Sequence, residues 1–300
     1  MEYPVEISEL PIVNHLDSIC ENLKNSKSRF LVLSANTGAG KSTSIPLALL
    51  KHFTGDILML EPRRIAVLNI AHRVSALLKE NVGETCGYSI HLDNKTSSKT
   101  RFTVLTEAIL TRKMQSDPSL DGVSVVVLDE FHERSIHADL ALAFLKEVMS
   151  IRDDLYVLIM SATINTKKLQ DYLGGTDLCP FYSVPGKLYP VEVLYENNLS
   201  MEKCIQDCLK SQTTGTILAF LPGIGEIRRV QNQLEDYRDV DIEILHSSVP
   251  IEKQKKVLEK VTDGRRRVVL SSAIAETSLT IPDVTVVIDS GLSRVNEYDK

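Results

Sequence analysis

Residues 34–43, with the sequence SANTGAGKST, combine glycines, a lysine and several hydroxyl side chains in one short stretch. Gly40, Lys41 and Ser42 fit the end of the phosphate-binding pattern G-x-x-x-x-G-K-[ST], although Ala35 stands where the pattern has its first glycine. In such a loop, backbone N–H groups surround phosphate oxygens, the lysine contacts the outer phosphates and the hydroxyl binds Mg²⁺. The alternative interpretation is an ordinary glycine turn that carries a surface lysine.

A second candidate for chemistry is the acidic pair Asp129 and Glu130, which follows the apolar run Val123–Leu128. In phosphate-loop enzymes, an aspartate at the end of a neighbouring strand holds Mg²⁺, and an adjacent glutamate can orient or deprotonate the attacking water. An isolated Asp-Glu pair after a strand more often caps the next helix. Because this pair follows the Lys41 loop in the expected order, the two together predict a site for a magnesium nucleotide.

These residues require a scaffold that brings several strand ends together, and the apolar pattern of the chain predicts one. Short runs rich in Val, Ile and Leu are typical of parallel strands that helices cover on both faces. In the first part of the chain the predicted strands are Phe30–Ser34, Ile57–Leu60, Phe102–Leu105, Val123–Leu128 and Tyr156–Met160. A second series comprises Val191–Leu194, Thr216–Phe220, Ile242–Leu245, Val268–Leu270 and Val284–Ile288. The fold class is therefore expected to be α/β, with mostly parallel sheets.

A junction between two domains is expected at about residues 180–190, where prolines and a glycine interrupt the pattern. We therefore predict a first domain over residues 1–183 and a second over residues 184–300. Two such domains in tandem would form a cleft between strand ends, where ligands of open α/β sheets usually bind.

The composition is that of a globular protein, because 43% of the 300 residues are hydrophobic and 25% are charged. The formal net charge of −6 gives no overall attraction to nucleic acid, so such binding would need local basic patches. We interpret the basic stretch Arg265–Arg267, together with the upstream Lys253, Lys255, Lys256 and Lys260, as a turn plus a solvated helix face rather than such a patch. Five scattered cysteines form no metal-binding set. Without a secretion signal or an apolar run long enough to span a membrane, we expect a cytoplasmic protein with no membrane partner.

The motifs resemble those of superfamily-two helicases of the DEAH-box kind. The stretches GAGKST, DEFHER and SAT, at residues 38–43, 129–134 and 161–163, resemble the family's phosphate loop, acidic motif and coupling motif. Further similar stretches are residues 61–64 for motif Ia, 105–110 for motif Ib, 220–223 for motif IV, 245–250, and 271–282 for motif V. Ala35 and the sequence DEFHERSIHADL are most similar to the bacterial HrpB-type branch, a set of ATP-dependent RNA helicases.

This resemblance implies two tandem RecA-like P-loop NTPase domains, each a mostly parallel sheet flanked by helices, with the second incomplete at residue 300. It also implies ATP and Mg²⁺ as cofactors. Catalytic roles then fall on Lys41, Asp129, Glu130 and His132, and the implied metal ligands are Ser42 and Asp129. The implied nucleotide-binding residues are Thr37, Gly38, Ala39, Gly40, Lys41, Ser42, Thr43 and Arg73, although Arg73 could equally be an exposed helix charge. The implied coupling residues, between phosphate site and domain movement, are Ser161, Ala162 and Thr163.

By the same resemblance, nucleic acid would contact both domains. The implied contacts are Pro62, Arg63, Arg64, Thr106 and Glu107 in the first domain and Gly223, His246, Ser247 and Thr277 in the second. Backbone N–H groups, hydroxyls and a few arginines suit phosphate contacts without base readout. The expected partner is therefore RNA, single-stranded or a duplex with an overhang, bound with little sequence specificity. The sequence points to no particular protein partner.

The chain stops at Lys300, before the arginine-rich motif VI and the C-terminal domains that this family normally has. Because such arginines stabilise the transition state of phosphoryl transfer, we expect these 300 residues alone to hydrolyse ATP weakly. Three alternatives are a nucleic-acid-dependent motor acting on DNA or ribonucleoprotein, a non-catalytic nucleotide-gated interaction module, and a P-loop enzyme acting on a small molecule. The presence of both motif series argues against the last two.

Overall fold

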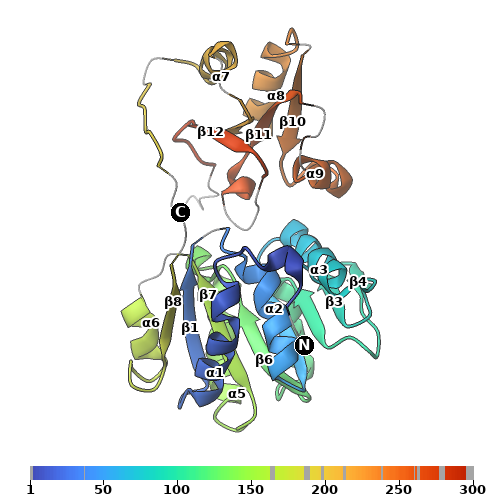
Figure 1. Cartoon of the computed structure of the whole chain (residues 1–300), viewed down its shortest axis with the longest axis vertical. Coiled ribbons are helices and arrows are strands. Elements are labelled where there is room, and N and C mark those ends of the chain that lie inside the picture. The colour runs from blue at the N-terminus through green and yellow to red at the C-terminus, as the bar shows by residue number, and fades with distance from the viewer. Residues whose placement is uncertain are drawn as a thin grey trace, which may run out of the picture. The chain divides into compact units, whose positions relative to one another are not determined.

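The computed structural model describes residues 3–36, 38–162, 166–185, 190–196, 199–211, 214–237, 239–259, 261, 264–276 and 281–294. The chain forms two compact units, residues 1–189 and 190–300, and each unit has its own sheet (Figure 1). The strand β8, Phe181–Val184, pairs with the first sheet, so the boundary expected after residue 183 would fall inside this strand.

Among the described residues of the first unit, eight strands form one sheet in the order β4-β3-β5-β2-β6-β7-β1-β8. All neighbouring strands are parallel except β4, which runs antiparallel to β3. Their bounds are β1 Phe30–Ala35, β2 Asp56–Leu60, β3 Cys86–Ile90, β4 Asp93–Lys95, β5 Phe102–Leu105, β6 Val123–Leu128, β7 Tyr156–Ser161 and β8 Phe181–Val184. The strands β1, β2, β5, β6 and β7 lie where the apolar runs predict them, because helices bury both of their faces.

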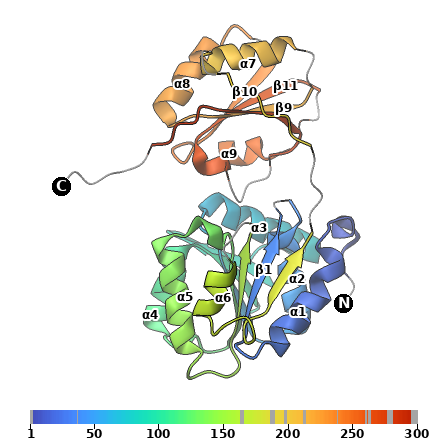
Figure 2. The same cartoon turned by 90° about the vertical axis from the view of Figure 1, so that its left-hand side faces the viewer.

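Two layers of helices cover this sheet (Figure 2). On one face lie α1 Leu16–Asn25, α2 Lys41–His52 and α3 Arg64–Leu78. On the other face lie α4 Glu107–Ser116, α5 Ile136–Val148 and α6 Thr166–Tyr172, which pack with alternate strand residues into one apolar core. The described residues of this unit also contain three short 3-10 turns, η1 Val5–Ile7, η2 Val13–His15 and η3 Phe131–Glu133.

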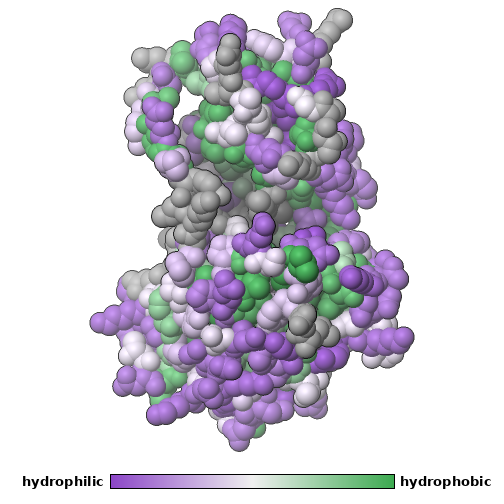
Figure 3. Space-filling view, viewed as in Figure 1, coloured by the Kyte–Doolittle hydropathy of each residue, from purple (hydrophilic) through white to green (hydrophobic). Residues whose placement is uncertain are grey.

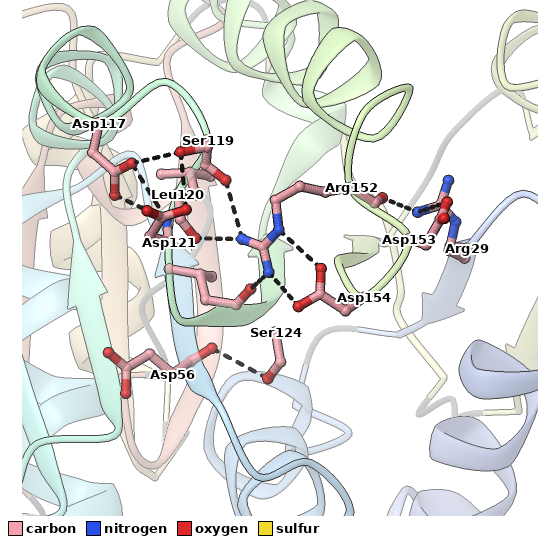
Figure 4. Close-up of polar contacts among 11 residues, drawn as sticks. Arg29, Asp56, Asp117, Ser119, Leu120, Asp121, Ser124, Arg152, Asp153 and Asp154 are labelled. Atoms are coloured by element: carbon pink, nitrogen blue, oxygen red, sulfur yellow. Dashed lines mark hydrogen bonds and ion pairs between the residues drawn. The ribbon is translucent and has the colours of Figure 1, made fainter.

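At the amino edge of the first sheet, Arg152 ties together the loops from which the strands start (Figure 4). Its guanidinium donates hydrogen bonds of 3.0 Å to the carbonyls of Ser119 and Val123, in the segment that leads into β6. Arg29, next to β1, donates to the carbonyl of Met149 at 2.7 Å. These contacts join the starts of β1, β6 and β7. The predicted motifs lie at the opposite, carboxyl edge of the sheet.

Among the described residues of the second unit, four parallel strands form a sheet in the order β10-β11-β9-β12. Their bounds are β9 Thr216–Phe220, β10 Val240–Leu245, β11 Arg266–Ser271 and β12 Val284–Asp289. The helices α7 Met201–Lys210 and α8 Ile224–Gln233 pack on one face, while α9 Ile251–Val257 and the turn η4 Ala273–Ala275 pack on the other. The second unit is thus a smaller α/β layer structure with a core on each face of its sheet.

One predicted strand is wrong. Val191–Leu194 forms no strand, and the residues Val191, Val193 and Leu194 are 80%, 65% and 72% exposed. A strand needs a hydrogen-bonded neighbour as well as an apolar pattern, and no described strand pairs with this run. The reverse error concerns β3, β4 and β8, for which the apolar pattern predicts no strand.

Arg266 and Arg267 begin β11 and Arg265 directly precedes it, so the expected turn is wrong for Arg266 and Arg267. The expected helix is present, because Lys253, Lys255 and Lys256 lie on α9, whereas Lys260 lies outside the described residues. The side chains of the stretch Arg265–Arg267 form ion pairs and hydrogen bonds within the second unit. Arg265 pairs with Asp241 at 3.1 Å, and Arg266 donates to the carbonyl of Leu209 at 2.6 Å. Arg267 is only 5% exposed, and burial lowers the pKa of its guanidinium. The stretch is therefore no open basic patch for nucleic acid.

The surface and the helices give two further observations. On the face of the first unit seen in Figure 3, hydrophilic residues predominate and hydrophobic ones form only small areas. No helix in the described part of the chain is long and apolar enough to cross a membrane.

Candidate functional site

The predicted motifs of the first unit meet at one edge of its sheet. Because the strands are parallel, the segments that follow β5, β2, β6, β7 and β1 lie there in that order. The loop after β1 and the acidic motif after β6 are on one side, and motifs Ia and Ib, after β2 and β5, are on the other. The N–H of Asp129 donates to the carbonyl of Leu60 at 3.0 Å, so the acidic motif directly adjoins motif Ia.

The loop between β1 and α2 has a backbone suited to phosphate. Gly38 and Gly40 have φ angles of +77° and +87°, which favour glycine. Lys41 is the first residue of the 12-residue helix α2, so the N–H groups of its first turn have no intrahelical partner. Such N–H groups and the helix dipole attract anions. Ala39, within this loop, is buried, and Thr37 lies outside the described residues.

The ammonium group of Lys41 points back into its own loop. Its Nζ donates a 2.5 Å hydrogen bond to the carbonyl of Ala35, and the residue is only 5% exposed. Ala35 is the last residue of β1 and has no positive φ, so the strand end does not require glycine there. The departure from the usual pattern at this position is therefore compatible with the loop.

The two predicted metal ligands contact each other. Oγ of Ser42 donates to Oδ2 of Asp129 at 2.6 Å, and the N–H of Glu130 donates to Oδ1 at 2.8 Å. Asp129 is 1% exposed, and burial raises its pKa despite the Ser42 hydrogen bond and the charge of Lys41. A hydroxyl and a carboxylate are hard oxygen ligands of the kind that Mg²⁺ prefers when phosphate oxygens and water supply the rest. The described residues contain no group of three or more His, Cys, Asp and Glu side chains that could hold a metal by themselves.

Glu130 and His132, in the same acidic motif, lie close to Asp129. Glu130 has a φ of +48°, which is uncommon for a residue with a side chain, and it is 6% exposed. Burial, followed by the charge of Asp129, raises the pKa of Glu130 to about 7. Nδ1 of His132 lies 3.4 Å from Oε2 of Glu130, while burial lowers the pKa of the imidazole. A carboxylate with a pKa near neutrality is suited to act as a general base.

The remaining nucleotide and coupling residues occupy different places. Oγ1 of Thr43 lies 3.4 Å from the Gly40 carbonyl, and Arg73 is exposed on α3. Ser161 ends β7 and is fully buried, with no hydrogen-bond partner for its hydroxyl among the described residues. Ala162 follows it half-buried, and Thr163 lies outside the described residues. Because β7 lies between β6 and β1, Ser161 sits between the acidic motif and the phosphate loop.

On the motif Ia and Ib side, the two adjacent arginines differ. Arg64 begins α3 and is exposed, whereas the side chain of Arg63 is 18% exposed and lies 3.4 Å from the Glu133 carboxylate. Glu107 begins α4 and accepts a hydrogen bond from the Ser135 hydroxyl. The other two predicted contacts of this unit, Pro62 and Thr106, are half-buried. Among the predicted contacts of this unit, all of which are described, Arg64 is therefore the one exposed cation.

The second unit places its predicted nucleic-acid residues after β9 and β10. Gly223 precedes α8 in an extended conformation and is buried. Nδ1 of His246 accepts the N–H of Ser248 at 3.1 Å, and burial lowers the pKa of the His246 imidazole. Ser247 is exposed, and Thr277 lies outside the described residues.

Two residues of the site were not predicted from the sequence. Glu133 contacts Arg63, and only its place inside DEFHER could have drawn attention to it. Leu10, from the segment before α1, packs on the phosphate loop: a Cβ on Gly40 would lie 2.5 Å from Cδ1 of Leu10. No sequence pattern signals this contact, because the two residues are brought together only by the fold.

The phosphate loop, the acidic motif and the two parallel sheets together have the arrangement of helicase domains. Residues 16–172 match the DEAD/DEAH box helicase family, and residues 200–299 match the helicase conserved C-terminal domain. The chain belongs to the DEAD/DEAH box helicase family. The predicted family and the predicted two RecA-like folds are confirmed.

Particular relatives resemble this chain closely. The ATP-dependent RNA helicase HrpB of Escherichia coli (strain K12) is 44% identical over 90% of this chain and 34% of its own length. The ATP-dependent RNA helicase DHX30 of Gallus gallus is 34% identical over 98% of this chain and 27% of its own length. A crystal structure of the E. coli DEAH/RHA helicase HrpB has a TM-score of 0.87 at 41% identity, over 97% of this chain and 38% of that one. The expected similarity to the HrpB type is confirmed, and the chain spans about a third of the length of HrpB.

Proposed function

We propose that this chain is part of an ATP-dependent RNA helicase, which hydrolyses ATP at the carboxyl edge of the first sheet to move along or unwind RNA. The observation that carries this proposal is the 2.6 Å contact between Ser42 and Asp129. It joins the loop that would bind the phosphates to the motif that would bind Mg²⁺ and orient the attacking water. Burying a carboxylate is costly unless it is paired or binds a metal, so the place of Asp129 beside the loop supports a site for a magnesium nucleotide.

The chemistry follows from the residues of the first unit. When ATP binds, the ammonium group of Lys41 would exchange its hydrogen bond to the Ala35 carbonyl for hydrogen bonds to the β- and γ-phosphates. The charged phosphate oxygens are stronger acceptors than a carbonyl oxygen. Ser42 and Asp129 would hold Mg²⁺, which neutralises phosphate charge when bound. Glu130 would orient the attacking water and accept its proton, a role that its raised pKa of about 7 supports.

We propose RNA as the nucleic acid, single-stranded or as a duplex with an overhang. The exposed guanidinium of Arg64 suits a phosphate contact, and the relatives HrpB and DHX30 are described as RNA helicases. Little sequence specificity is expected, because the proposed contacts from both units are backbone groups, hydroxyls and single charges. The cytoplasm is the proposed location, since none of the five cysteines, all of them described, forms a disulfide.

The test is a steady-state ATPase assay on the full-length protein with four additions: single-stranded RNA, RNA duplex with an overhang, single-stranded DNA, and none. We expect hydrolysis to need Mg²⁺ and to rise with RNA more than with DNA. Lys41→Ala is the inactive control, because it removes the phosphate-binding cation. Hydrolysis no faster than that control would contradict the enzymatic proposal, whereas stimulation by DNA alone would contradict the choice of RNA.

A further inference from the structure

We propose that Glu133 is a positioning residue that holds Arg63 until an RNA phosphate takes it over, and that this exchange transmits RNA binding to the turn that carries Glu130. The inference rests on the proposed function and assigns a role to a residue outside the nucleotide site. It concerns how the expected RNA-binding motif after β2 is coupled to the acidic motif after β6.

The first observation is the contact itself. Nη2 of Arg63 lies 3.4 Å from Oε1 of Glu133, and the two side chains are 18% and 23% exposed. Arg63 follows β2 and Glu133 follows β6, which are neighbouring strands. The pair thus bridges the motif expected to contact RNA and the motif expected to act on ATP, and its partial exposure lets a phosphate reach the guanidinium.

The second observation is the short turn that joins Glu133 to the catalytic glutamate. The N–H of Glu133 donates to the carbonyl of Glu130 at 2.9 Å, which closes the turn η3. Glu130 and Arg134, on either side of it, have φ angles of +48° and +51°. Because only two residues separate the two glutamates, a shift at Glu133 is passed to Glu130 through one hydrogen-bonded turn.

The charges explain the direction of the effect. A phosphate and the Glu133 carboxylate are both anions, and both would bind the guanidinium of Arg63 through its planar N–H groups. While Glu133 holds Arg63, it competes with the RNA phosphate for the guanidinium. Removing the negative charge of Glu133 should therefore strengthen RNA binding, although it removes an ion pair from the folded chain.

The same segment contains a matched control. Arg134 pairs with Asp139 at 3.0 Å, with side chains 61% and 40% exposed. This pair joins the turn to α5 instead of β2, so it lies off the proposed route. Asp139→Asn therefore removes one carboxylate charge from the same neighbourhood without releasing Arg63.

The experiment is a double-mutant cycle on the full-length protein, with fluorescence anisotropy of labelled single-stranded RNA. Glu133→Gln should lower the Kd for RNA by roughly threefold, and Arg63→Gln should raise it by about tenfold. In the double variant the Glu133 change should have no effect, because the guanidinium that it releases is absent. Asp139→Asn should leave the Kd unaltered.

A second measurement tests the transmission step. RNA stimulation, the ratio of ATPase rates with and without RNA, should fall by roughly threefold or more in Glu133→Gln and stay at the wild-type value in Asp139→Asn. Glu133→Ala should act in the same direction, which covers a poorly folded glutamine variant. Thermal unfolding of each variant is measured alongside.

Two results would overturn the inference. One is an equal change in Kd on removing Glu133 with and without Arg63, which would mean that the two residues do not act through each other. The other is wild-type RNA stimulation in folded Glu133→Gln and Glu133→Ala. If the wild-type protein itself neither binds RNA nor responds to it, the proposed function fails, and this inference fails with it.

Discussion

The hydroxyl of Ser42, in the first turn of α2, donates a 2.6 Å hydrogen bond to the carboxylate of Asp129, at the end of β6. This contact brings together two motifs that are 87 residues apart in the chain. It depends on β7 alone separating β1 from β6, since that order brings their carboxyl ends close. Among the residues around this contact, we expect some to bind ATP and others to act in its hydrolysis.

Lys41 and Glu130 should give different defects. Lys41→Ala removes the cation that meets the phosphates, so ATP binding should weaken. Glu130→Gln keeps the shape of the site but removes the base, so binding should persist while hydrolysis slows by roughly 10²–10⁴-fold. Binding of a fluorescent ATP analogue and the steady-state ATPase rate distinguish the two. An unaltered hydrolysis rate in Glu130→Gln would remove this residue from the proposed chemistry.

Gly40→Ala should damage the phosphate loop. The φ of +87° is costly for alanine, by roughly 1–2 kcal/mol, and the new methyl group would meet Leu10 at 2.5 Å. We expect at least about tenfold weaker nucleotide binding, because the loop must shift. Gly122→Ala is the control: its φ is +77° with nothing within 4 Å, so it should lose stability but keep binding.

A companion variant separates the two causes. Leu10→Ala clears the space above the loop, so in the Gly40→Ala background it should recover part of the nucleotide affinity. If the double variant binds no better than Gly40→Ala alone, the backbone angle accounts for the whole defect and the contact with Leu10 is unimportant.

The stability of the first unit should depend on Asp17 at neutral pH and not in acid. The carboxylate contacts His52 at 2.7 Å, Tyr3 at 2.6 Å and Lys51 at 2.9 Å, and these contacts hold the pKa of Asp17 well below its usual range. Because the folded-state pKa is depressed, the stabilisation is present above the unfolded pKa of about 4 and disappears as the pH falls through the folded value.

The corresponding measurement is urea unfolding of the wild type and Asp17→Asn at pH 7 and pH 2. The side chain of Asp17 is 50% exposed, so solvent screening should limit the difference at pH 7 to less than about 1 kcal/mol. The difference should shrink at pH 2. A larger difference in acid than at neutrality would contradict the assigned contacts.

The cysteines should react in two classes. Cys20 and Cys86 are fully buried, and burial raises the pKa of each thiol to about 12. Cys179 is also buried, with its pKa raised to about 11, whereas Cys204 and Cys208 are half-buried on α7. We expect the last two to react first with a disulfide reagent. Replacing both with serine should abolish the fast phase, and a persistent fast phase would contradict the described burial.

Much of the scaffold can be predicted from the sequence, for a physical reason. The strands β5, β6 and β9 occupy the predicted residues, because buried parallel strands are short continuous apolar runs. By contrast, β8 lies at the edge of its sheet and has two exposed residues, so it lacks such a run. The exposed Val191–Leu194 shows the opposite error, in which an apolar pattern has no strand beside it.

The site was predictable only where a motif names the residue. Lys41, Ser42 and Asp129 could be assigned because phosphate and metal chemistry demand those residue types at strand ends. The contact of Glu133 with Arg63 could not, since it depends on β6 lying beside β2. Strand order and side-chain burial are tertiary properties, and local sequence patterns do not contain them.

The last prediction concerns Arg64, the exposed member of the two motif Ia arginines. If its guanidinium binds an RNA phosphate, Arg64→Gln should weaken RNA binding by a similar factor for every sequence, because phosphate contacts carry no base information. The slope of log K against log salt should fall in magnitude by about one, since one fewer counterion is released.

Lys79→Gln is a matched control, because Lys79 is an exposed cation at the other end of the same helix, far from the carboxyl edge. Anisotropy titrations with two unrelated RNA sequences at several salt concentrations measure both effects. Nucleotide binding should stay at the wild-type level, because Arg64 takes no part in the phosphate loop. An equal change of slope in Lys79→Gln, or a loss confined to one RNA sequence, would show that Arg64 is not the phosphate contact.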